Sequence, residues 1–188
     1  HRLGLTPKLA NELYDLGIDG MTGGDHSFDK KDIIPYIRKE KRLIRPLNMA
    51  EGTPGSGMMT LKGRNGEAVL FVNLLGRVFM QPSDDPFAAM ERVLKEVQLK
   101  KHVSSIIVDL HAEATSEMMA FAHHFDGRIS AVLGTHTHVP TSDAHILKGG
   151  TALQSDLGMC GDYDSVIGTA SAQPIERFTK GMSSSAFE

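Results

Sequence analysis

The chain has 188 residues, of which 40% are apolar and 23% charged, and this composition suits one soluble globular domain with a hydrophobic core. Its formal charge of -3 is spread without a basic block, which argues against extended nucleic acid or an anionic membrane surface as the main partner. No apolar run approaches the roughly 18 residues of a membrane span, and the single cysteine, which excludes an intrachain disulfide, favours a reducing, cytoplasmic location.

The first third of the chain predicts a helix, a strand and a second helix. Thr6 precedes a proline and apolar residues at helical spacing, so it is the expected N-cap of a helix that Gly17 ends. Residues 18–22 form a weak strand candidate, and residues 31–39 carry isoleucines on one helical face. Glycine and proline then mark residues 45–57 as loop.

The middle of the chain predicts alternating strands and helices. Residues 58–62 and 68–74 flank an Asn65-Gly66 turn signal and form an expected β-hairpin. Asp84 or Asp85 is the expected cap of a helix with apolar residues at helical spacing up to Val97. A β-branched strand follows at residues 105–110, and a helix is expected from Thr115 to His124.

The last third predicts a strand at residues 129–133, a hairpin of residues 144–147 and 151–154 at one sheet edge, and a short helix at residues 174–180. We expect Cys160 to be a small packed residue. Because neighbouring helical residues point in different directions, His123 and His124 are interpreted as surface charges and not as metal ligands.

Three of the predicted strands each end at a histidine. The first is followed by Asp25-His26, the strand at residues 105–110 by His111, and the strand at residues 129–133 by Gly134-Thr135-His136-Thr137-His138. In an extended segment, side chains two residues apart project to the same side, so His136 and His138 can both reach a cation. Ligands gather at the carboxyl ends of strands in an open α/β sheet, and the pattern therefore predicts a shared metal site.

The predicted ligands Asp25, His111, His136 and His138 are a nitrogen-rich set with one carboxylate, which suits Zn, Mn or Fe better than Ca or Mg. A hydrolytic pair of cations needs more ligands, including a bridging carboxylate. We expect the missing carboxylates upstream of His1.

These motifs resemble the last three metal motifs of the calcineurin-like metallophosphoesterases. Other segments are similar to a bacterial branch of that family whose members act as cyclic-nucleotide phosphodiesterases. The resemblance covers nearly the whole chain and implies one metallophosphoesterase domain over residues 1–188, partial at its N-terminus. The similar segments are residues 28–31, 45–46, 52–55, 84–87, 111–117 and 126–128.

The resemblance implies a layered α/β sandwich whose N-terminal strands, with the first aspartate ligand and the bridging acid, are missing. It makes His111 and His136 ligands of one metal and His138 a ligand of the other, places Asp25 at the first metal, and makes His26 the general acid. The family has asparagine where this chain has Asp25, which alters the charge that faces a phosphate.

The implied activity is that of a metal-dependent phosphodiesterase that hydrolyses cyclic nucleotides or related small phosphodiesters with two divalent transition-metal ions, Fe, Mn or Zn. The alternative is a catalytically impaired regulatory protein of the same fold that binds metal or nucleotide. Other metallohydrolase folds fit less well, since Val139 and Pro140 follow His138 where a β-lactamase-like fold needs aspartate and histidine. An exposed sheet edge would favour association into a homo-oligomer.

Overall fold

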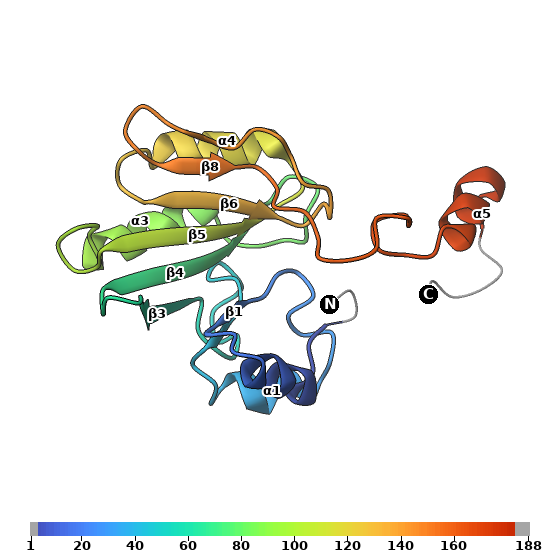
Figure 1. Ribbon diagram of the computed structural model, residues 1–188, viewed down its shortest axis with the longest axis horizontal. Coiled ribbons are helices and arrows are strands. Elements are labelled where there is room, and N and C mark those ends of the chain that lie inside the picture. Colours follow the sequence, from blue (N-terminus) through green and yellow to red (C-terminus); the bar gives the residue numbers. More distant parts are fainter. Residues whose placement is uncertain (1–3, 183–188) are drawn as a thin grey trace.

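The computed structural model describes residues 4–182, and a six-stranded sheet organises this part of the chain (Figure 1). The strand order is β3-β4-β5-β6-β8-β7, in which β4, β5, β6 and β8 are parallel and the two outer strands pair antiparallel. The strands are β3 (Met58–Lys62), β4 (Ala68–Leu75), β5 (Ser105–His111), β6 (Ala131–Thr135), β7 (His145–Ile146) and β8 (Ala152–Gln154).

Helices α3 (Pro86–Glu96) and α4 (Thr115–His124) pack on one face of this sheet and form the main core with it. Asp85 caps α3, because its Oδ1 accepts a hydrogen bond from Phe87 N at 2.8 Å. The Phe87 and Phe121 rings, whose centroids lie 5.3 Å apart, join the two helices. Burial alternates along β5, so Ile106, Val108 and Leu110 face the helices and the intervening side chains face the opposite side.

That opposite face is where the second, smaller unit of structure lies. Strands β1 (Met21–Thr22) and β2 (Leu43–Ile44) pair in parallel, and helices α1 (Pro7–Asp15) and α2 (Ile33–Ile37) accompany them. Ile33, Ile37 and Leu43 form a core cluster of their own. Thr6 caps α1, as predicted, by accepting a hydrogen bond from Leu9 N at 3.2 Å.

The carboxylate of Asp143 ties the loop between β6 and β7 to the residue that follows β8. Asp143 Oδ1 accepts hydrogen bonds from Thr141 Oγ1 at 2.6 Å and from Ser155 N at 3.2 Å. Hydrogen bonds from Ser155 and then Thr141 hold the pKa of Asp143 at about 2. After Asp156 the chain leaves the sheet, and helix α5 (Ala172–Lys180) lies away from it (Figure 1).

The structure confirms a mixed α/β fold with a central sheet flanked by helices, and the elements lie close to their predicted positions. Two of the expectations differ from the structure. The strand predicted at residues 18–22 shortens to β1 and pairs with β2, at residues 43–44, where no strand was predicted. Cys160 is exposed and not packed, because its glycine-rich segment lies on the surface.

No helix within residues 4–182 combines the length and the hydropathy needed to cross a membrane. The expected strand upstream of His1 lies outside the described residues.

Candidate metal centre

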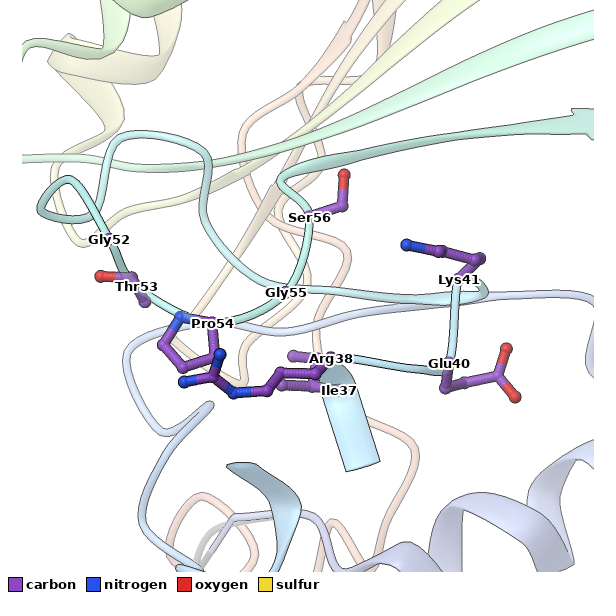
Figure 2. A pocket seen from close by; sticks show the side chains of 9 residues that line it. All are labelled: Ile37, Arg38, Glu40, Lys41, Gly52, Thr53, Pro54, Gly55 and Ser56. Atoms are coloured by element: carbon purple, nitrogen blue, oxygen red, sulfur yellow. The ribbon is translucent and has the colours of Figure 1, made fainter. Parts of the chain in front are cut away.

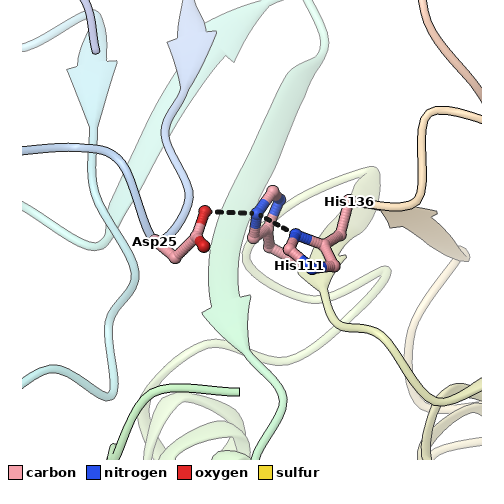
Figure 3. Close-up of side chains that lie close together, drawn as sticks. All are labelled: Asp25, His111 and His136. Carbon is pink, nitrogen blue, oxygen red and sulfur yellow. Dashed lines mark hydrogen bonds and ion pairs between the residues drawn. The ribbon is translucent and has the colours of Figure 1, made fainter. Parts of the chain in front are cut away.

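Asp25, His111 and His136 converge at the carboxyl ends of the central strands β5 and β6, and we refer to them as the trio (Figure 3). His111 Nε2 lies 3.0 Å from Asp25 Oδ1 and 3.1 Å from His136 Nδ1. The three potential ligand atoms all lie within 4.8 Å of one another. The pattern of strands that end at histidines therefore did bring these side chains together.

Strand register explains the convergence. β5 and β6 are parallel neighbours in which His111 pairs with Thr135, so His136 follows directly beside His111. Asp25 comes from the smaller unit, three residues after β1. Gly24 permits its approach, because a Cβ at that position would lie 2.7 Å from His111 Cε1. A glycine is thus needed where the two parts of the molecule meet.

A hydrogen-bond chain fixes the protonation of His111. Thr135 Oγ1 donates its single proton to Asp109 Oδ1 at 2.7 Å, so it must accept from His111 Nδ1 at 2.9 Å. The Nδ1 proton is therefore used, and Nε2 of a neutral ring presents a lone pair to the Asp25 carboxylate. The contact between Nε2 and the Asp25 carboxylate is favourable only when Nε2 carries a positive charge. That charge is either a second proton on the ring or a metal cation.

The carboxylate of Glu113 orients the ring of His136 so that it, too, presents a lone pair to the trio. Glu113 Oε2 lies 3.3 Å from His136 Nε2, where it can accept the ring proton and leave the lone pair on Nδ1, toward the trio. Burial, and then the neighbouring charge of His111, lower the pKa of His136 below its usual value. A neutral imidazole is the form that binds a metal.

The trio consequently offers a carboxylate oxygen and two imidazole lone pairs to one point. Ligand atoms on one tetrahedral ion stand roughly 3.3 Å apart when the bonds are about 2.0–2.1 Å, and two of the separations here are 3.0 and 3.1 Å. Two nitrogens and an oxygen suit a divalent transition metal. Outer hydrogen bonds to each histidine are the usual companions of such ligands. The residues present therefore fit the metal that the sequence pattern predicts.

The charge of the trio is also set by its surroundings. With a second proton on His111, at Nε2, the hydrogen bond from this ring lowers the pKa of Asp25 to about 2, so the carboxylate stays ionised at neutral pH. Burial instead raises the pKa of Asp109, and this effect exceeds the lowering by the hydrogen bonds from Thr22 and Thr135. Asn73 Nδ2 donates to Asp109 Oδ2 at 3.2 Å and adds a further neutral partner.

His26 lies beside the trio. Its Nε2 is 3.8 Å from Asp25 Oδ2, and its Nδ1 lies 2.8 Å from Asp29 Oδ2, which can accept the Nδ1 proton. Its side chain is 52% exposed, so substrate and solvent can reach the Nε2 atom. This is a geometry in which a histidine can give up a proton at the rim of a metal site.

His138 lies outside the trio, and its Nδ1 contacts the Ile167 carbonyl oxygen at 2.8 Å. Its backbone φ of 66° and the φ of 135° at His136 are unusual for residues other than glycine. Asp156, which is 1% exposed, stabilises this turn, because its Oδ2 accepts from Thr137 N at 2.9 Å and Thr137 Oγ1 at 2.8 Å.

Sequence reasoning missed Thr135, Asp156 and the contact between Glu113 and His136 as supports of the site. Thr135 stands directly before His136, so a hydroxyl within the metal motif was a usable signal. Asp156 gave none, because it lies nearly twenty residues away and no spacing rule links it to the histidines.

A surface cavity of about 530 Å³ lies elsewhere, between the end of α2 and the loop before β3 (Figure 2). Arg45 stiffens this loop by donating to the carbonyl oxygens of Thr53, Pro54 and Gly55 at 3.1–3.3 Å. None of the trio lines it. The lining residues are Ile37, Arg38, Glu40, Lys41, Gly52, Thr53, Pro54, Gly55 and Ser56.

Comparison with known proteins gives one consistent set of relatives. The family described as YmdB-like protein matches residues 1–188. A Bacillus subtilis protein named 2',3'-cyclic-nucleotide 2'-phosphodiesterase is 45% identical over 178 residues, which are 95% of this chain and 66% of that protein. The chain thus spans slightly less than two thirds of the length of the curated relatives that it matches.

Two solved structures share the fold. A crystal structure of a hypothetical protein from Thermus thermophilus is 45% identical with a TM-score of 0.90, and the match covers 98% of this chain and 71% of that one. A crystal structure described as a novel phosphatase from Mycoplasma pneumoniae is 36% identical with a TM-score of 0.86, over 98% and 66% of the respective chains.

Proposed function

The chain belongs to the YmdB-like family within the metallophosphoesterase superfamily, and from this membership we propose that it forms the metal-binding part of a phosphodiesterase. The proposed substrates are cyclic nucleotides or related small phosphodiesters. The observation that supports it best is the trio, in which a carboxylate and two oriented imidazoles present lone pairs to one point.

A bound divalent transition metal, Fe, Mn or Zn, would polarise the phosphoryl group and lower the pKa of a coordinated water. Asp25, His111 and His136 would hold this ion. Thr135 and Glu113 would keep the two imidazoles neutral on the side that faces it. His138 is proposed to contribute to a second ion, together with ligands beyond the trio.

His26 is proposed as the general acid. Asp29 holds Nδ1 and leaves Nε2 facing the trio, where a proton can pass to the leaving oxygen of a phosphodiester. Asp25, in the position where related enzymes carry asparagine, adds a negative charge beside that oxygen. This charge would strengthen the hold on the metal, because a carboxylate attracts a cation more strongly than a neutral amide does.

We further propose one domain over residues 1–188, a cytoplasmic location, and the absence of a membrane or extended nucleic acid among its partners. The single exposed Cys160 suits a reducing compartment. Association into a homo-oligomer is proposed because β3 leaves one edge of the main sheet open.

The test compares His26→Ala with wild type in metal content and in hydrolysis of adenosine 2',3'-cyclic phosphate. Loss of a general acid should lower turnover about 10²- to 10⁴-fold while metal content stays the same. If His26→Ala loses its metal, the assigned role is wrong. If wild type with metal bound hydrolyses no phosphodiester, the regulatory binding protein of the same fold replaces the proposed enzyme.

A further inference from the structure

The loop that follows β4, residues 76–82, is attached to the trio at both ends. Leu75 pairs with His111 in the sheet, and Gly76 N donates to the His111 carbonyl oxygen at 2.9 Å. At the other end, Gln81 Nε2 lies 3.4 Å from the Asp25 carbonyl oxygen. The loop therefore borders the site along its span from His111 to Asp25.

The first residues of this loop are held rigidly. Glu117, in the first turn of α4, accepts hydrogen bonds from Arg77 N at 3.0 Å and Val78 N at 3.1 Å. A Cβ at Gly76 would lie 2.5 Å from Ala112 Cβ, so the chain passes too closely for a side chain at that position. The tip of the loop therefore lies between residues 76–78, which these contacts hold, and Gln81, which contacts the Asp25 carbonyl oxygen.

Phe79 occupies that tip in a strained conformation. It is the third residue of a turn that Met80 N closes onto the Arg77 carbonyl oxygen at 3.4 Å, and its φ is 61°. Glycine or asparagine is the ordinary residue at such a position. The ring is 89% exposed, the highest fraction among the large apolar side chains of residues 4–182. Folding gains little from this aromatic ring, which leaves its faces free to contact a ligand.

We propose that Phe79 stacks on the base of a nucleotide whose phosphodiester lies at the trio, an inference that rests on the proposed phosphodiesterase function. A rigid, exposed aromatic ring is the side chain on which bases stack, and every base offers a π-face to it. The site therefore accepts purine and pyrimidine nucleotides alike, and the ring distinguishes nucleotides from phosphodiesters without a base.

The experiment uses the metal-loaded full chain with two substrates, adenosine 2',3'-cyclic phosphate and the base-free ethylene glycol cyclic phosphate. Phe79→Asn removes the ring and keeps a residue that tolerates positive φ. It should raise KM for the nucleotide about 5- to 160-fold, the loss expected of one stacked base, and leave KM for the base-free substrate unchanged. Phe79→Trp should restore the nucleotide KM. Phe178→Ala, on the similarly exposed Phe178 of α5, is the control and should change neither KM value.

An unchanged nucleotide KM in Phe79→Asn overturns the inference and leaves the proposed function intact. Equal increases for both substrates also overturn it, since they mean that Phe79 only supports the loop. If wild type hydrolyses neither substrate, the proposed function fails, and calorimetric titration with adenosine 3'-monophosphate and inorganic phosphate decides the stacking separately. Stacking then requires that Phe79→Asn weaken binding of the nucleotide and not of phosphate, and equal binding by both proteins contradicts it.

Discussion

Replacing Thr135 with valine isolates the hydrogen-bond chain that orients His111. Valine keeps the shape of threonine but removes the hydroxyl that accepts from His111 Nδ1 at 2.9 Å and donates to Asp109 Oδ1 at 2.7 Å. Loss of an outer partner of a histidine ligand typically costs 10- to 100-fold in metal affinity. At 1.36 kcal/mol per factor of ten, the expected loss is about 1.4–2.7 kcal/mol.

The metal affinity of Thr135→Val is measured by competition with a chromogenic zinc chelator, and its stability by urea unfolding of the metal-free chain. Two partly buried polar atoms lose a partner, so the free energy of unfolding should also fall by about 1–3 kcal/mol. Thr135→Ser is the matched control, because serine restores the hydroxyl and should restore the affinity. Zinc binding by Thr135→Val within twofold of wild type would refute the role assigned to this hydroxyl.

Of three further predictions, two concern other supports of the site and one concerns the loop before β7. Gly24→Ala places a Cβ 2.7 Å from His111 Cε1 and should lower zinc affinity at least tenfold. Gly161→Ala is the control, because its Cβ would meet no atom closer than 3.6 Å. It should change neither the zinc affinity nor the stability by more than about 0.5 kcal/mol. Asp156→Asn replaces a carboxylate that accepts backbone and hydroxyl protons with an amide that can also donate. Thermal unfolding should show a loss of about 1–3 kcal/mol in the free energy of unfolding, and the metal content should fall. A variant as stable as wild type would contradict the role of this carboxylate in the turn. Asp143→Asn should be less stable than wild type by about 1 kcal/mol at pH 6, because a folded-state pKa of about 2, below the usual 3.8, means that the charged form stabilises the fold above pH 4. That difference should disappear as the pH of the urea unfolding experiment falls toward 2, and a difference that is constant with pH would contradict it.

Local patterns were enough to predict most elements of the fold. The proline after Thr6 and the Asp84-Asp85 pair identified the starts of α1 and α3, and the Asn65-Gly66 turn located the β3–β4 hairpin. Strands as short as β1 and β2 carry too few residues to show a period, so their pairing could not be predicted. The exposure of Cys160 depends on where its loop lies in space, which composition does not determine.

The trio was predictable because each ligand stands at the end of a recognisable strand, and parallel strands end at the same edge of a sheet. The residues that support the trio were not predictable, because they depend on contacts between distant parts of the chain. Asp156 reaches the turn at Thr137, and Gly24 accommodates the ring of His111, only once the sheet and the smaller unit have come together.

The most direct test of the central claim is elemental analysis of metal in the full chain, purified without added metal, beside the His111→Ala variant. A metal centre at the trio predicts at least one equivalent of Fe, Mn or Zn per chain in wild type, and two if His138 contributes to a second ion. The variant should lose the equivalent that the trio holds while circular dichroism shows the same fold. Equal metal content in the two proteins, or none in wild type, would contradict the claim that these three side chains form a metal site.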